Sequence, residues 1–247
     1  MKMAGNTILI TGGGSGIGRE LAQRFHALGN VVIVAGRRSE ALEETIAGRD
    51  RMCAMMLDVD DPDAIAAIAR RVITEHPRFN VLINNAGIMR REDLTRSRDL
   101  GDAEETIVTN LLAPIRLTNA LIDHLAAQPD PAIVNVSSGL AFVPLSATPT
   151  YSATKAAIHS YTVSLRTQLK GKVDVIELMP PGVQTELTPG QSAREGYMPL
   201  GEFADEMMAL FQRQPTPEEI LVERVGFLRW AERDGRFDQV VEMLSAR

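Results

Sequence analysis

The chain has 247 residues, 45% of them hydrophobic, so it is long enough to bury a substantial core within one domain. A formal net charge of −6 argues against nucleic-acid binding, which needs a basic face or stripe. The single cysteine, Cys53, excludes an internal disulfide, and no apolar run is long enough to cross a bilayer, so we expect a cytoplasmic protein with no membrane partner.

Short apolar runs alternate with amphipathic helical patterns along most of the chain. The runs predict strands at 6–11, 31–35, 52–57, 81–84, 132–136 and 173–178. The patterns predict helices at 16–28, 39–47, 63–75, within 102–127, and at 153–169. This alternation implies right-handed crossovers, and we therefore predict a single α/β domain over 1–247, a doubly wound parallel sheet of six or seven strands flanked by helices.

Two stretches depart from the alternation. Residues 90–101 form a polar loop, and residues 184–217 mix proline, glycine and charge. Long connections in compact domains are often binding loops, so we expect a substrate lid at about 186–216. An apolar stripe in this region either walls a pocket or packs in the core, and it comprises Tyr197, Met198, Leu200, Phe203, Met207, Met208 and Phe211.

A glycine-rich turn joins the first predicted strand to the first predicted helix. Glycines let the backbone approach a ligand closely, and the free N–H groups at a helix start attract a pyrophosphate. We therefore predict a Rossmann-type dinucleotide site, which includes Gly12, Ser15, Gly16, Ile17 and Gly18.

The second strand ends at Gly36-Arg37-Arg38, where an acidic residue would bind the ribose 2′-hydroxyl of NAD. Two guanidinium groups suit a 2′-phosphate instead, because arginine offers forked donors and a permanent charge. The alternative is that Arg37 and Arg38 are surface residues that open a helix. NADP(H) is therefore favoured as the cofactor, and NAD(H) stays open.

Tyr151 and Lys155 are four residues apart in a predicted helix, so they share one face. A nearby ammonium favours the phenolate form of tyrosine and lowers its pKa from about 10. The same spacing occurs on many solvated helix faces, and it indicates chemistry only together with the other motifs.

In combination, these motifs resemble the short-chain dehydrogenase/reductase family over residues 6–185. The resemblance implies a cofactor role for Asp58 and Val59 at the adenine, for Asn85, Ala86 and Gly87 in an N-N-A-G motif, and for Pro181, Gly182, Val183 and Thr185 near the nicotinamide. It implies catalytic roles for Ser138, Tyr151, Lys155 and Asn110, the last in a kinked helix that orders a relay water. Within the family, the turn, Gly36-Arg37-Arg38 and the chain end resemble a bacterial branch related to an oxidoreductase of the D-alanine lipoteichoic acid operon.

Some of these residues have ordinary explanations when taken singly. Asp58 could cap a strand end, Asn110 could lie on a solvated face, and Ser138 could belong to a turn. The chain also departs from the family pattern, since 236–247 is more helical than strand-like in composition. That ending puts the last sheet strand in doubt, and with it the tetramer contact that the family often builds there. The resemblance still implies a homo-oligomer, with a dimer through the fourth helix and the Tyr151 helix, and a tetramer stays open.

The resemblance implies an oxidoreductase that moves a hydride between a nicotinamide and a small-molecule carbonyl or alcohol. Tyr151 would be the general acid/base, Ser138 would polarise the carbonyl, and Lys155 would hold the ribose. No metal is predicted, because the four histidines are scattered without the spacing of a site. The alternative from another class is a dinucleotide-sensing regulator with the same fold and no chemistry.

Overall fold

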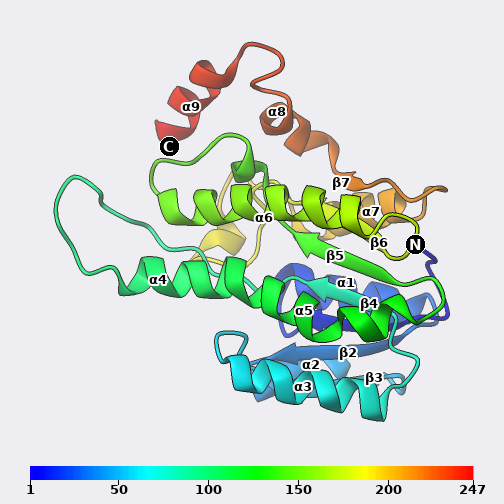
Figure 1. The fold of residues 1–247 in the computed structure, drawn as a ribbon. Coiled ribbons are helices and arrows are strands. Elements are labelled where there is room, and N and C mark those ends of the chain that lie inside the picture. The colour runs from blue at the N-terminus through cyan, green and yellow to red at the C-terminus, as the bar shows by residue number, and fades with distance from the viewer. Residues whose placement is uncertain (247) are drawn as a thin grey trace.

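A computed structural model describes residues 1–246 as one parallel sheet between two layers of helices (Figure 1). Its seven strands are β1 Thr7–Thr11, β2 Val31–Gly36, β3 Met52–Met56, β4 Val81–Asn84, β5 Ala132–Val136, β6 Asp174–Met179 and β7 Glu219–Leu221. The α-helices are α1 Gly16–Ala27, α2 Ser39–Ile46, α3 Pro62–Glu75, α4 Gly101–Ile107, α5 Ala113–Ala126, α6 Pro149–Gln168, α7 Leu200–Phe211, α8 Gly226–Arg229 and α9 Phe237–Ser245. The predicted fold class is confirmed.

The strand order is β3-β2-β1-β4-β5-β6-β7, and every neighbouring pair is parallel. The order reverses between β1 and β4, which places the turn after β1 beside the turn after β4. Ligands bind at this switch point in open α/β sheets, because the two loops diverge and leave a crevice there. The topology therefore sets the predicted dinucleotide site at the carboxyl edge of the sheet.

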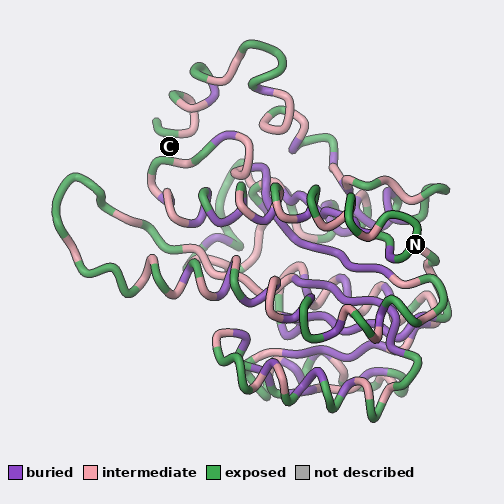
Figure 2. Tube along the Cα trace, viewed as in Figure 1, coloured by how far each residue is buried: buried purple, intermediate pink, exposed green. Residues whose placement is uncertain are grey.

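Each sheet face carries its own apolar core. Ile8 and Ile10 of β1 pack on the side of α1 and α7, while Leu9 packs on the side of α3 and α5. This alternation follows from the two-residue period of a strand. Figure 2 shows the strands buried along most of their length and the helices exposed on their outer faces. Both faces are covered, which explains the nearly continuous apolar composition of the strands.

The predicted helix within 102–127 is interrupted by a π-helical segment, η1 Val108–Leu112, between α4 and α5. The Tyr151 helix begins earlier than predicted, at Pro149 rather than near residue 153. Proline suits the first turn of a helix, and the Glu92 carboxylate accepts hydrogen bonds from the Thr150 N–H and hydroxyl at 2.9 and 2.7 Å. A residue from the 90–101 loop thus fixes the start of α6.

The C-terminal region resolves two open points. Residues 237–245 form α9, as the composition indicated, and the seventh strand lies upstream of them at Glu219–Leu221. The apolar stripe of α7 packs in the core, where the Phe211 ring meets the Phe25 ring of α1 at 5.7 Å. Within residues 1–246, no helix combines the length and apolar character that a membrane span requires.

Candidate active site

The glycine-rich turn after β1 is shaped for a close backbone approach. Gly12 has a φ of +66°, and a Cβ at this position would lie 2.9 Å from the Ala86 Cα. At Gly18, a Cβ would lie 2.3 Å from the Gly12 carbonyl oxygen. The first turn of α1 contains no acidic residue, so its free N–H groups remain available to an anion.

The segment after β4 braces this turn. The Thr11 hydroxyl accepts hydrogen bonds from the backbone N–H groups of Asn85 and Ala86 at 3.1 Å, and the Asn85 amide donates to the Thr11 carbonyl at 2.9 Å. The resemblance implies a cofactor role for Asn85, and in the structure its amide is directed to the backbone of the turn. The Asn85 side chain therefore fixes the backbone of the glycine-rich turn.

Two arginines lie beside the glycine-rich turn in the same crevice. Arg38 donates to the Ser15 hydroxyl at 3.0 Å, and Arg37 lies 4.0 Å from the Asp60 carboxylate. Asp58 faces solvent and accepts a hydrogen bond from the Asp60 N–H at 3.1 Å, which is the strand-end role rather than a place in the wall of the crevice. The two guanidinium groups thus bring positive charge to the wall of the crevice beside the turn.

Asn110 lies in η1 and bridges two parts of the site. Its carboxamide accepts from the Ile88 N–H at 2.9 Å and donates to the Ile88 carbonyl at 2.8 Å. It also donates to the Thr154 hydroxyl of α6 at 3.3 Å. The solvated-face explanation is therefore wrong, because Asn110 is buried and ties the segment after β4 to the Tyr151 helix.

Ser138, Tyr151 and Lys155 meet at the carboxyl end of β5. Ser138 follows β5, its hydroxyl accepts a hydrogen bond from the Leu140 N–H at 3.1 Å, and Tyr151 and Lys155 are buried on the inner face of α6. The Lys155 ammonium lies 5.5 Å from the centre of the Tyr151 ring and donates to the Val136 carbonyl at 2.8 Å. A hydroxyl, a phenol and an ammonium thus share one small volume.

Burial shifts both titrating groups of this set away from their charged forms. It raises the pKa of Tyr151 to about 12, against the effect of the Ser138 hydroxyl, which lowers it. It lowers the pKa of Lys155 to about 8, and the negative charge of Glu177 opposes this change. In the protein alone, the Tyr151 pKa is therefore not lowered as the spacing predicted, because loss of water outweighs the hydrogen bond with Ser138.

Two cavities meet at these residues. A cavity of about 420 Å³ runs from the arginines past the glycine turn to Lys155. A second cavity of about 840 Å³ extends from Ser138 and Tyr151 to α8 and α9. Ser138 and Tyr151 line both cavities, so a ligand in each would meet at the serine hydroxyl and the phenol.

Comparisons with known proteins agree with this geometry. Residues 6–196 match the family model for short chain dehydrogenase. The chain belongs to the short-chain dehydrogenase family. It is 40% identical to the uncharacterized oxidoreductase DltE of Bacillus subtilis (strain 168), over 100% of this chain and 99% of that protein, which confirms the predicted branch. It is therefore an NAD(P)-dependent oxidoreductase.

Two solved structures share the whole fold. A Burkholderia cenocepacia short chain dehydrogenase in complex with NADP is 23% identical, with a TM-score of 0.85 over 99% of each chain. A Burkholderia phymatum short chain dehydrogenase/reductase in complex with NAD is 22% identical, with a TM-score of 0.83 over 96% of each chain. The two neighbours carry different dinucleotides, and at this identity the likeness shows the fold that they share with this chain.

Most of the family residues predicted from the sequence line the smaller cavity. They are Gly12, Ser15, Gly16, Ile17, Gly18, Arg37, Arg38, Val59, Asn85, Ala86, Gly87, Ser138, Tyr151, Lys155, Pro181, Val183 and Thr185. Three others do not line it: Asp58 faces solvent, Asn110 lies behind the wall, and Gly182 lines the larger cavity. A nicotinamide dinucleotide fits this lining, because the glycine-rich turn leaves its backbone open to a ligand where any Cβ would fill the space. The guanidinium groups of Arg37 and Arg38 add positive charge to the same wall.

Some functional residues were missed by the sequence reasoning. The larger cavity is lined by Tyr197 of the predicted lid, but also by residues of α8 and α9 such as Phe227, Leu228 and Met243. Among the remaining stripe residues, Met198, Phe203 and Met207 are buried in the core. No local motif marks 224–245 as part of the site, because its position depends on how the C-terminal segment folds back over η2 Gly139–Ala141.

Proposed function

We propose that this protein reduces a carbonyl compound, or oxidises the matching alcohol, with Tyr151 as the general acid/base. The observation that carries the proposal is the meeting of the two cavities at Ser138 and Tyr151, with Lys155 beside the phenol. A bound nicotinamide would supply or accept the hydride in the smaller cavity. A carbonyl in the larger cavity would then lie against the serine hydroxyl and the phenol.

The protein groups account for the proton and for the charge that develops on oxygen. Ser138 donates a hydrogen bond to the carbonyl oxygen and polarises the C=O bond. Tyr151 then transfers its phenolic proton to that oxygen. The raised pKa of Tyr151, about 12, keeps the proton on the phenol at neutral pH, which suits the reduction direction. Lys155 stabilises the phenolate that remains. Asn110 fixes the backbone at Ile88, where a water would pass a proton from solvent back to the phenolate.

The test is an assay of NADPH absorbance with a panel of ketones. Consumption of NADPH with formation of the alcohol supports the enzyme, and a matched loss in Ser138→Ala assigns the serine. A protein that binds NADPH tightly but turns over no member of a broad panel would favour the dinucleotide-sensing regulator instead.

We also propose NADP(H) as the preferred cofactor. Arg37 and Arg38 line the crevice, and Arg38 is aligned by its hydrogen bond to Ser15. A guanidinium–phosphate contact is charge-assisted and is roughly twice as strong as a neutral hydrogen bond. Calorimetric titration with NADPH and NADH at low salt tests this, and equal affinities would remove the assignment.

The larger cavity favours a substrate with an apolar body and an acidic group. The apolar part of its wall includes Leu140, Leu145 and Phe227. The wall also contains two arginines, Arg194 and Arg224, which both lie beside residues 196–197. Arg194 lies 5.1 Å from the Tyr197 ring centre, and Arg224 donates to the Gly196 carbonyl at 3.2 Å. Within residues 1–246, neither arginine forms an ion pair. Reduction of benzoylpropionate with a lower KM than its methyl ester supports this preference, and the reverse order contradicts it.

A lid over the substrate remains a proposal, and we place it in the part of 186–216 that precedes α7. Segment 192–196 is exposed and lines the larger cavity through Arg194, Glu195 and Gly196, while α7 packs against α1. Hydrogen exchange measures it directly. We expect fast exchange in 186–199 that slows when cofactor and substrate bind, and slow exchange in the free protein would contradict a lid.

A homodimer through α4, α5 and α6 is the proposed assembly. Ile107, Leu112 and Val163 are large apolar side chains that lie exposed on these helices and on η1. Burying them would offset the cost of association. Sedimentation equilibrium of the protein and of Val163→Glu tests the proposal, which predicts a dimer that dissociates in the variant.

A further inference from the structure

A buried carboxylate lies behind the catalytic residues, and the proposed mechanism does not use it. Glu177 of β6 has no exposed surface. Its strand lies next to the edge strand β7, and Glu177 is paired in register with Asn135 of β5 and Glu219 of β7. A buried carboxylate is costly unless hydrogen bonds and a positive charge compensate it, so its neighbours indicate what it does there.

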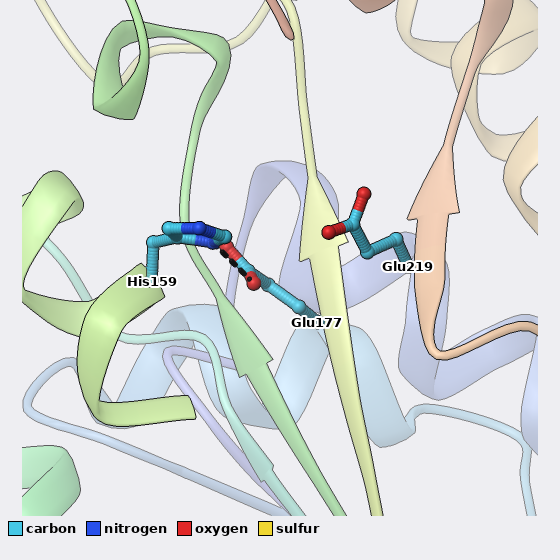
Figure 3. A group of neighbouring side chains, drawn as sticks. All are labelled: His159, Glu177 and Glu219. Atoms are coloured by element: carbon cyan, nitrogen blue, oxygen red, sulfur yellow. Dashed lines mark hydrogen bonds and ion pairs between the residues drawn. The ribbon is translucent and has the colours of Figure 1, made fainter. Parts of the chain in front are cut away.

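Two side chains hold the Glu177 carboxylate, one on each oxygen. The Ser137 hydroxyl donates to Oε1 at 2.5 Å. His159 Nδ1 lies 2.9 Å from Oε2, the contact marked by the dashed line in Figure 3. Ser137 stands between Val136, whose carbonyl accepts from the Lys155 ammonium, and the catalytic Ser138. Glu177 is therefore fixed directly against the backbone that positions Ser138 and Lys155.

His159 extends the catalytic row of α6. Tyr151, Lys155 and His159 follow one another at intervals of four residues, so they lie one turn apart on the same helix face. The Glu177 carboxylate contacts this helix face at His159. The row thus places one buried negative charge beside two groups that can carry a positive charge.

A metal ion is a weaker explanation of the same cluster. His159, Glu177 and Glu219 could offer ligand atoms within 4.8 Å of one another, a grouping that the scattered histidines of the sequence did not reveal (Figure 3). Glu219, however, forms a two-point ion pair with Arg229 at 3.0 and 3.1 Å. The guanidinium already supplies the cation for Glu219, and the Glu177 oxygens already have partners. The cluster is satisfied as an ion-pair network.

We propose that Glu177 is a positioning residue of the active site, the buried carboxylate that, held by Ser137 and His159, keeps Lys155 in its ammonium form. This role rests on the proposed function, because Lys155 acts beside Tyr151. The need for it follows from the burial of Lys155, which favours the neutral amine. A neutral amine would neither stabilise the Tyr151 phenolate nor hold a proton for its return.

The groups around Lys155 make Glu177 the source of the negative charge. Tyr151, on the same helix, keeps its proton at neutral pH and is uncharged. The charge of Glu177 is the electrostatic contribution that raises the pKa of Lys155. His159 on α6 contacts the Glu177 carboxylate and not Lys155. The charge of Glu219 on β7 is neutralised by its ion pair with Arg229 of α8. Removing the Glu177 charge should therefore favour the neutral amine, while removing the Glu219 charge should have little effect.

The experiment measures the Lys155 pKa directly by NMR titration of protein labelled at its lysine Cε and Nζ atoms. The sequence contains four lysines, so the Lys155 signal is assigned by its loss in Lys155→Met. In Glu177→Gln we expect the pKa of Lys155, about 8 in the parent chain, to fall by about one pH unit. The matched control Glu219→Gln should leave it unchanged, and Glu177→Asp should largely restore it.

Activity gives a second readout that a purely structural role would not change. If Lys155 must be protonated, kcat/KM falls as the pH rises through its pKa, and this basic limb should move to lower pH in Glu177→Gln by the same amount. An unchanged Lys155 pKa in folded Glu177→Gln overturns the proposal. If that variant does not fold, the apolar double variant Glu177→Leu/His159→Leu takes its place, with the same expectation. Because the titration needs no turnover, it stays decisive even if Tyr151 proves not to be the catalytic acid.

Discussion

The cofactor cavity and the larger cavity beside it are built in different ways. The first is lined largely by loops that follow strands of the sheet, together with Tyr151 and Lys155 of α6. The second draws much of its wall from 194–197, 224–228 and 243–245, which lie in the long connection after β6 and in the C-terminal segment after β7. Residues of the first cavity are therefore fixed by the sheet, whereas the second depends on how the C-terminal third packs.

The shared wall of the two cavities should show the largest effect. Tyr151→Phe keeps the ring and its packing but removes the proton donor, so turnover should fall by roughly 10²–10⁴-fold while NADPH affinity changes little. The absorbance assay and a fluorescence titration of NADPH measure the two quantities. Tyr161→Phe is the matched control, since Tyr161 lies on α6 but lines neither cavity. Turnover above a tenth of the parent value would contradict the role of Tyr151.

The cofactor side alone should respond to a change at the end of β2. Gly36→Asp with Arg37→Ser should reverse the preference from NADPH to NADH, because the carboxylate binds the ribose hydroxyls and repels the phosphate. A Cβ at Gly36 would meet the nearest atom of Leu42 at 3.6 Å, an ordinary contact, so the fold should tolerate it. Losing a charge-assisted contact costs roughly 1.5–3 kcal/mol, or about ten- to more than a hundredfold in NADPH affinity. Arg70→Ser, at an exposed arginine of α3, should leave both affinities unchanged.

The same difference explains what could be predicted from the sequence. The strands and the glycine turn were predicted from spacing that reflects local geometry, and the set of Ser138, Tyr151 and Lys155 was predicted from the family resemblance. The hydrogen bonds by which Asn85 braces the glycine turn were not predicted, because they depend on β1 and β4 being adjacent in space. Glu92 and Glu177 were missed for a similar reason. They are single acidic residues, and their partners lie tens of residues away in the sequence.

The C-terminal third shows the limit most clearly. The stripe that includes Phe203 and Met207 has the spacing of an amphipathic helix, and periodicity cannot decide between a pocket wall and a core. α7 packs it on α1. The pocket wall comes instead from α8 and α9, whose own apolar residues form a small cluster with Val143. The NADP(H) preference, the oligomeric state, the lid and a cytoplasmic location stay predictions.

At the boundary of the two cavities, the burial of Lys155 predicts a pH-dependent stability. Its folded-state pKa of about 8 lies below the ordinary 10.5, so between these values the unfolded chain binds more protons than the folded one. The free energy of unfolding should therefore rise with pH from about 8 to 10, by up to ~1.4 kcal/mol per pH unit. Lys155→Met should remove this slope. The difference in the free energy of unfolding between the variant and the parent chain should therefore change in favour of the parent chain as the pH rises. Urea unfolding at several pH values measures both, and parallel curves for the two proteins would contradict the effect.

The substrate side alone should respond to Arg224, which has no place in the cofactor cavity. If its guanidinium binds an acidic group of the substrate, Arg224→Gln should raise the KM for benzoylpropionate while leaving its methyl ester and the NADPH affinity unchanged. Arg224 is exposed, so solvent screens the contact, and a loss of about 0.5–1 kcal/mol corresponds to roughly two- to fivefold in KM. The effect should shrink further at high salt, because an exposed ion pair is screened within a Debye length. Arg213→Gln, an exposed arginine just beyond α7 that lines neither cavity, is the control. Equal effects of Arg224→Gln on the acid and the ester would mean that the arginine shapes the wall without recognising charge, and the acidic group would then be dropped from the substrate description.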